Sequence, residues 1–206
     1  FNDGKLNINY DYLNNPNFSD GIYNVIALNG GKISGGNINL IAKGIDLKDA
    51  DLTSSGNISF TTKDGANFIQ AAANVSKTNG IKFDNNSSIQ IANSSLRSSD
   101  PDGLIDLVTD KASNVVTTGS SFTAKDTNVT ARNIYFNRGL TAPTTTVATN
   151  TFVSGNLTTN ANGANGIVNT NVKGKATINA EAYNSIDKLT TKELDTSAGY
   201  FTNLTN

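Results

Sequence analysis

Residues 37–40 read Asn-Ile-Asn-Leu, residues 57–60 read Asn-Ile-Ser-Phe, and residues 133–136 read Asn-Ile-Tyr-Phe. In each copy two apolar side chains stand two residues apart with one polar residue between them. This is the alternation of a strand that has one buried face and one wet face. Gly36 and Gly56 precede the Asn in two of the copies and allow a sharp turn before the strand begins. The motif therefore predicts one rung of a repeating β structure.

The rung returns along the chain at a nearly constant interval. After Ile38/Leu40 the apolar pair recurs after 20, 23 and 24 residues, at Ile58/Phe60, Ile81/Phe83 and Ile105/Leu107. A second apolar series lies between these pairs and keeps its internal spacing in two places, at Ile45, Leu47 and Leu52 and at Ile89, Ile91 and Leu96. Short strands with Gly-, Asn- and Asp-rich turns on such a period are typical of a β-solenoid. We therefore predict an all-β parallel β-helix with about 20–25 residues per coil.

The pattern divides the chain into four parts. Residues 1–34 hold short apolar alternations broken by turn signals, and we expect initial rungs or hairpins there. Residues 35–136 hold the regular β-helix coils. Residues 137–146 are rich in Thr and contain a Pro, so we expect a loop, and residues 147–206 are expected to form further, less regular coils. Near 180–194 the spacing fits either a strand or a short helix, and strand is favoured.

The composition argues against several classes of function. The chain has 206 residues, of which 36% are apolar and 16% charged, and its net charge of −1 gives no reason to expect nucleic acid as a partner. There is no Cys and no His, so thiolate and imidazole ligands and imidazole acid–base catalysis are missing. No apolar run is long enough to span a bilayer. We expect a protein without enzyme activity, cofactor, metal site or membrane span.

Two consecutive stretches carry a family resemblance. Residues 29–44 read Asn-Gly-Gly-Lys-Ile-Ser-Gly-Gly-Asn-Ile-Asn-Leu-Ile-Ala-Lys-Gly, and residues 45–60 read Ile-Asp-Leu-Lys-Asp-Ala-Asp-Leu-Thr-Ser-Ser-Gly-Asn-Ile-Ser-Phe. They resemble the Gly-x-Ile-x-Leu rungs of filamentous-haemagglutinin-like adhesins, the exoproteins of bacterial two-partner secretion. The resemblance is clearest over residues 29–136.

The resemblance implies a right-handed parallel β-helix that is secreted through an outer-membrane partner protein. It also implies a role in cell adhesion and virulence, as a stalk or adhesive surface on the bacterial cell. Because the chain opens on Phe1 rather than Met, we expect a fragment of a longer protein.

Tyr135 is the best candidate for a ligand contact. It takes the outward position of the third rung copy, and Arg132 and Arg138 lie close to it in the sequence. Tyr is favoured at interfaces, and aromatic faces are large contact surfaces with a polar tip. The alternative is that Tyr135 binds no ligand and only covers the outer face of a strand. We name Tyr135, Arg132 and Arg138 as the candidate contacts for a receptor or glycan.

Carboxylates gather at one turn, residues 99–103. Asp100 and Asp102 there, with Asp106 nearby, could supply oxygen ligands to Ca²⁺. Pro-Asp-Gly is also a strong turn former, and the later Glu of an EF-hand is missing. We favour an ordinary turn and predict no metal site.

Two hypotheses about function follow. The first is a structural and adhesive segment of a secreted surface exoprotein, a rigid monomeric rod that presents contacts to a host or bacterial surface receptor or glycan. The alternative is a module like a phage tailspike or polysaccharide lyase, which binds or cleaves surface glycans. It predicts a trimer and a pair of carboxylates brought together by stacking, for which Asp46/Asp64 and Asp84/Asp106 are candidates.

Overall fold

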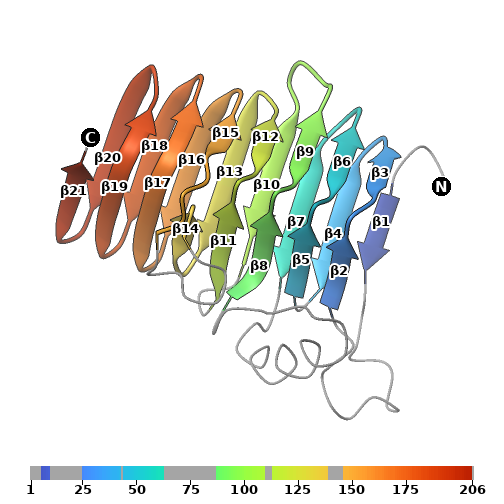
Figure 1. The fold of residues 1–206 in the computed structure, drawn as a ribbon, viewed down its shortest axis with the longest axis horizontal. Helices are drawn as coiled ribbons and strands as arrows, with labels where there is room; N and C mark the ends of the chain where they lie inside the picture. The colour runs from blue at the N-terminus through green and yellow to red at the C-terminus, as the bar shows by residue number, and fades with distance from the viewer. Residues whose placement is uncertain are drawn as a thin grey trace, which may run out of the picture.

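The structure is a computed structural model that describes residues 6–9, 25–42, 44–62, 87–109, 113–138 and 146–205. Within these ranges every regular element is a strand, and the strands wind into a stack of coils that runs from the N-terminal to the C-terminal end of the molecule (Figure 1). All strand pairs are parallel, apart from one isolated antiparallel bridge between Arg138 and Thr146. The predicted all-β parallel β-helix is therefore confirmed.

Each coil contributes one strand to a first, eight-stranded sheet. Its strands, in spatial order, are β1 (Leu6–Asn9), β4 (Ile38–Ala42), β7 (Ile58–Thr62), β10 (Leu104–Val108), β13 (Asp126–Ala131), β16 (Asn156–Ala161), β18 (Lys175–Ala180) and β20 (Glu193–Ala198). The other strands of each coil belong to a second sheet of thirteen strands, and this sheet bends at one corner within each coil.

The second sheet has two strands per coil at first and one long strand per coil later. The first strands of the coils are β2 (Val25–Asn29), β5 (Gly44–Lys48), β8 (Ser87–Ala92), β11 (Asn114–Thr118) and β14 (Ile134–Phe136). The second strands are β3 (Lys32–Gly35), β6 (Asp51–Ser54), β9 (Ser95–Ser98), β12 (Ser121–Thr123) and β15 (Thr151–Val153). The long strands β17 (Ala164–Val172), β19 (Tyr183–Thr190) and β21 (Phe201–Thr205) follow, and β17 pairs with both β14 and β15.

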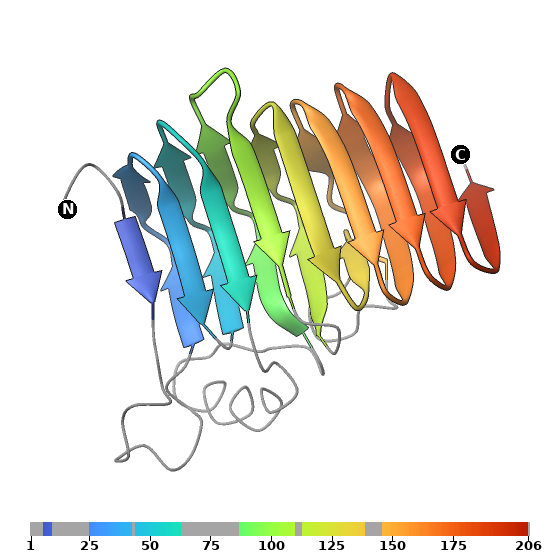
Figure 2. The ribbon, with the colours of Figure 1, turned by 180° about the vertical axis from the view of Figure 1, so that it is seen from behind.

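The winding is right-handed. In Figure 2 the strands of the first sheet lie in front and run downward, those of the second sheet lie behind and run upward, and the chain advances to the right. This is the hand that parallel strand–crossover–strand connections almost always take, because of the twist of the strands. Leu157 pairs with Ala176 and Ala176 with Leu194, so the last complete coils advance by only 19 and 18 residues.

Apolar ladders fill the space between the sheets. Leu40, Phe60 and Leu107 are partners in register, and each is 0% exposed. The second apolar series stacks as its spacing predicts: Ile45 pairs with Ile89, Leu47 with Ile91 and Leu52 with Leu96. Burial of such side chains stabilises each coil by about 25 cal/mol per Å² of apolar area.

One predicted coil is wrong. The sequence spacing places Ile81/Phe83 as a rung between Ile58 and Ile105, but Ile58 pairs directly with Ile105. Residues 63–86, which include Ile81 and Phe83, lie outside the described residues. In the first sheet β10 follows β7 directly, so no further rung stands between Ile58 and Ile105.

The Asn before each rung has a structural role. Asn37 Oδ1 accepts a hydrogen bond from the Asn57 backbone N–H at 2.9 Å, and Asn57 Oδ1 accepts one from Leu104 at 3.0 Å. A Cβ on Gly56 would lie 2.1 Å from Asn37 Oδ1, so the Gly leaves room for the Asn of the preceding coil. The Gly-Asn sequence is thus a turn that hydrogen-bonds to the same turn one coil away.

A column of left-handed residues forms the corner between the two parts of the second sheet. Seven residues of positive φ lie there, namely Gly30, Asp49, Asn93, Gly119, Asn137, Asn169 and Lys188, and Gly31, next to Gly30, has a positive φ as well. Gly, Asn and Asp adopt this conformation most readily, and they supply six of these seven positions. In the earlier coils this corner separates two strands, such as β14 and β15. In β17 and β19 the corner lies inside one long strand, at Asn169 and Lys188, and the two strands pair on both sides of it.

The structure can be compared with the four parts of the chain that the sequence predicts. Within residues 1–34, β1, β2 and β3 pair in parallel with the next coil, as initial rungs and not as hairpins. The loop expected at 137–146 is closed by the Arg138–Thr146 bridge. The short helix considered near 180–194 is wrong, because β19 and β20 are strands that pair with β17 and β18. The coils beyond 147 are the shortest of the stack.

Candidate functional site

Tyr135 and Arg138 meet over a glycine on the outer side of the second sheet. Tyr135 pairs with Gly166 of the next coil, and a Cβ on Gly166 would lie 2.9 Å from Tyr135 Cδ1 and 3.3 Å from Arg138 Nε. Both side chains are half-buried, and Arg138 Nη1 also donates to Thr146 Oγ1 at 3.5 Å. Two of the three predicted contact residues, Tyr135 and Arg138, thus pack together, and both lie against Gly166 of the neighbouring strand β17.

Arg132 lies elsewhere. It is exposed in the turn between β13 and β14, at the corner between the two sheets. The rung that follows it, Ile134–Phe136, also differs from the prediction. It was expected to repeat Ile38–Leu40, but β14 belongs to the second sheet and Ile38 to the first. Asn133 still acts as a corner residue, because its Oδ1 accepts a hydrogen bond from the Ala164 N–H at 2.8 Å.

The predicted carboxylate clusters do not assemble in the described part of the chain. Asp102 forms an ion pair of 2.6 Å with Lys125, which lowers the pKa of Asp102 through a hydrogen bond. Asp106 pairs with Ser59 and Asn128, and not with another Asp. The suggested partners Asp64 and Asp84 lie outside the described residues. Among the described residues no three acidic side chains come close enough to hold a metal ion.

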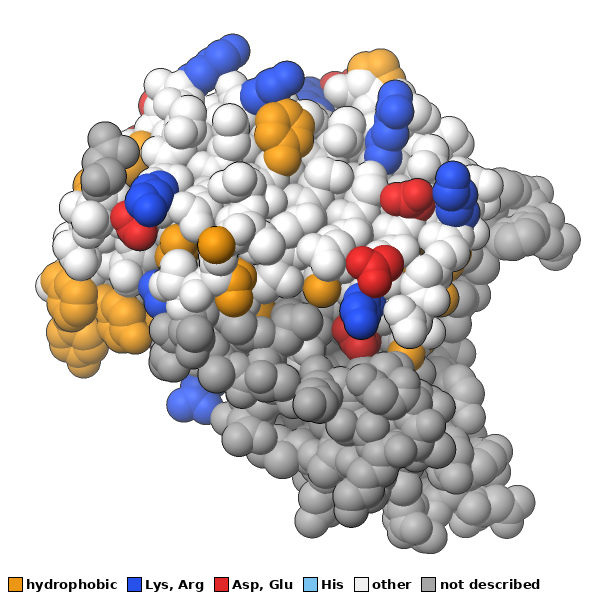
Figure 3. Space-filling model, viewed as in Figure 1, with side chains coloured by type: hydrophobic (Ala, Val, Ile, Leu, Met, Phe, Trp, Pro, Cys, Tyr) orange, Lys and Arg blue, Asp and Glu red, His pale blue; other side chains and the backbone are white. Residues whose placement is uncertain are grey.

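The outer side of the second sheet carries scattered charges with few hydrophobic side chains between them (Figure 3). Lys173 lies over the ring of Phe152, with Nζ 5.2 Å from the ring centroid. A hydrophobic group lies at the C-terminal end of the stack, where the rings of Tyr183 and Phe201 stack with centroids 5.3 Å apart. Leu204 on the last strand is 57% exposed.

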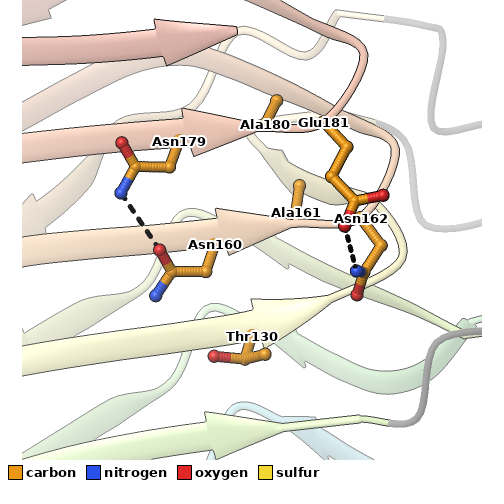
Figure 4. A pocket seen from close by; sticks show the side chains of 7 residues that line it. All are labelled: Thr130, Asn160, Ala161, Asn162, Asn179, Ala180 and Glu181. Carbon is orange, nitrogen blue, oxygen red and sulfur yellow. Dashed lines mark hydrogen bonds between the residues drawn. The ribbon is translucent and has the colours of Figure 1, made fainter. Parts of the chain in front are cut away.

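An open groove of about 280 Å³ lies at the end of the first sheet, where three coils turn toward the second (Figure 4). One bank is formed by outward side chains of β13, β16 and β18, and the other by the turns that follow β16 and β18. The lining residues are Thr130, Asn160, Ala161, Asn162, Asn179, Ala180 and Glu181. The groove follows the axis of the stack, because Thr130, Asn160 and Asn179 are partners in register.

Hydrogen bonds hold both banks in place. Asn179 Nδ2 donates to Asn160 Oδ1 at 3.1 Å on the strand bank, and Asn162 Nδ2 donates to Glu181 Oε1 at 2.9 Å on the turn bank (Figure 4). Between the banks the chain passes through Ala161 and Ala180, whose side chains point inward: Ala161 belongs to the hydrophobic core and Ala180 packs against it. The groove therefore presents side-chain amides, the Thr130 hydroxyl and one carboxylate, a set that can donate and accept hydrogen bonds.

We did not predict this groove from the sequence, although a signal is present. The triplet polar-Ala-polar occurs as Thr130-Ala131-Arg132, Asn160-Ala161-Asn162 and Asn179-Ala180-Glu181. Its middle residues are partners in register. Arg132 therefore takes, one coil earlier, the turn position that Asn162 and Glu181 take beside the groove. Of the predicted contacts, Arg132 is the one that the fold brings to this corner.

A separate buried carboxylate, Asp46 on β5, gives a pH-dependent prediction. Asp46 is 8% exposed, and its burial raises its pKa to about 6 despite the attraction of Lys48. The folded chain thus binds this proton more tightly than the unfolded chain, whose Asp pKa is about 4. The free energy of unfolding should therefore fall as the pH rises from about 4 to 6.

Asp46→Asn should remove this dependence. We expect the variant to be more stable than the parent at neutral pH by about 2 kcal/mol, and to show no gain in acid below both pKa values. Urea denaturation followed by circular dichroism across this pH range measures the difference. Asp51→Asn, at an exposed carboxylate on β6, is the control. An equal gain at all pH values would contradict the assignment.

Comparisons with protein-family models, with curated proteins and with solved structures found no match for this chain. In the described ranges there is no helix that is long and apolar enough to cross a membrane.

Proposed function

We propose that this chain is a structural and adhesive segment of a secreted bacterial surface exoprotein of the filamentous-haemagglutinin-like kind. Its coils form a rigid stalk, and the outward side chains of the stalk make contacts with a host or neighbouring cell. In this proposal an outer-membrane partner protein carries the longer parent chain out of the cell.

The observation that carries the proposal is the continuous parallel stack. Eight strands of the first sheet follow one another without interruption, a distance of about 34 Å at about 4.8 Å per strand. Each coil contacts mainly its neighbours, which is how solenoid proteins build extended binding surfaces. Asn and Thr occupy most outward positions of β13, β16 and β18, with Asp126 and Lys175 at the start of two of these strands, which suits polar contacts over a long side surface.

The experiment is an adhesion assay with the purified chain. Beads coated with the folded chain should bind epithelial cells or glycan-bearing bacteria more strongly than beads coated with the heat-unfolded chain. Light scattering should report a monomer. Beads that bind no better than the unfolded control would contradict the adhesive role. A stable trimer that shortens a polysaccharide would favour the tailspike-like or lyase-like alternative.

A further inference from the structure

The groove beside β13, β16 and β18 has a repeating plan. In each of the two coils of β16 and β18, one polar side chain on the strand faces one polar side chain on the turn, with an Ala between them. Successive coils are about 4.8 Å apart, so the polar pairs recur at this interval along the groove. A ligand that fits such a plan is an extended polymer that offers hydrogen-bonding groups at short, regular intervals.

We propose that this groove binds a linear, uncharged glycan that lies along the axis of the stack. The inference rests on the proposed adhesive function and names the site and the ligand class of that contact. Sugar hydroxyls both donate and accept hydrogen bonds, as the side-chain amides of Asn160, Asn162 and Asn179 do.

The charges favour an uncharged ligand. Among the described residues that line the groove, Glu181 is the charged one, and its carboxylate would repel a uronic or sulfated sugar. Arg132 lies one coil further along the turn bank and carries the opposite charge. An anionic chain would thus meet attraction at one end of the groove and repulsion at the other.

The geometry favours a glycan over an extended peptide. A peptide usually gains affinity by adding a strand to a free sheet edge and by inserting side chains into pockets. At the groove the backbones of β13, β16 and β18 already pair with one another, so they offer no free edge. Because the Ala161 and Ala180 side chains point into the core, the outward side chains of the lining offer a peptide polar contacts only.

The test uses ¹⁵N-labelled full chain titrated with cellohexaose, chitohexaose or mannohexaose and followed by NMR. At least one of these should shift the side-chain amide signals of Asn160, Asn162 and Asn179, and a heparin hexasaccharide should not. Asn160→Ala and Asn179→Ala should each weaken binding about tenfold, the effect of one or two lost hydrogen bonds. Asn160→Phe, which places a bulky ring on the exposed strand bank of the groove, should abolish it. Thr177→Ala, on the next outward position of β18, should bind like the parent.

The outcomes separate this inference from the proposed function. Binding that persists in Asn160→Ala, Asn179→Ala and Asn160→Phe, or shifts confined to another face, would overturn the groove assignment. So would the absence of binding by all three hexasaccharides, or binding of a Gly/Ser peptide in their place. The unfolding curve of each variant checks that it is folded. If the groove variants still promote bead adhesion, the adhesive function stands without this site.

Discussion

Asn137→Ala should destabilise the protein by about 4 kcal/mol, because one buried side chain joins three coils. Asn137 is 0% exposed. Its Oδ1 accepts hydrogen bonds from the Gly119 N–H at 3.0 Å and from the hydroxyls of Thr149 and Thr151 at 3.1 and 3.0 Å. Its Nδ2 donates to the carbonyl oxygens of Val168 and Asn169 at 2.6 and 2.9 Å.

The cost has two sources. Truncation leaves several buried donors and acceptors without a partner, each at about 1–3 kcal/mol before relaxation. Asn137 also has a φ of 56°, a conformation that Ala adopts less readily than Asn. Asn93→Ala separates the two terms, because Asn93 has a φ of 47° at the same corner but is exposed. We expect that control to lose about 1 kcal/mol.

Urea denaturation monitored by circular dichroism measures both variants. Hydrogen exchange should show where the loss is felt, with faster exchange of the Gly119 N–H, which donates to Asn137 Oδ1, in Asn137→Ala alone. Equal losses for Asn137→Ala and Asn93→Ala would mean that backbone strain, and not the hydrogen-bond network, is the main contribution of Asn137.

Phe60→Ala is the second large effect, with an expected loss of about 4 kcal/mol from a cavity in the apolar ladder. Phe60 is 0% exposed, and its partners in register are Leu40 and Leu107. The neighbouring coils cannot collapse onto the gap without breaking the strand pairing on both sides of Phe60. The removed ring therefore leaves most of its volume empty.

Two variants sharpen this prediction. Phe60→Leu should recover most of the loss, because Leu already occupies the ladder positions above and below. Phe152→Ala is the matched control, since Phe152 is a half-buried ring on the outer face that lies under Lys173. We expect the control to lose about 1 kcal/mol or less. If Phe60→Ala costs no more than Phe152→Ala in urea denaturation, Phe60 is not the ladder residue described here.

The ladders show which parts of the fold the sequence predicts. The alternation at Ile38–Leu40 predicts which side chains face the core, because neighbouring residues of a strand point to opposite faces. The recurrence of Ile38/Leu40 as Ile58/Phe60 predicts a ladder, and these residues do pair in register, because the same spacing on both coils leaves one register in which all apolar residues stay inside.

The errors have a common cause. Residues 133–136 have the sequence pattern of the first-sheet rung but include a strand of the second sheet, and Ile58 pairs directly with Ile105 where the spacing predicts a rung between them. Strands of the two sheets have the same alternation of apolar and polar residues, because this alternation depends only on having one buried face. Which coil a strand stacks on depends on the length of the insertions, and these are nearly free to vary.

The sequence by itself thus determined the type of element, the buried face of each strand and the residues suited to the corners, because these depend on local chemistry. Tertiary structure alone decided what lies side by side on the surface. It placed Tyr135 and Arg138 over Gly166, whereas Arg132 lies in the turn between the two sheets. It also aligned Asn160 with Asn179 and Asn162 with Glu181, and these four side chains line the groove. Those neighbours are 19 residues apart in the chain, and they meet because the coil there closes after 19 residues.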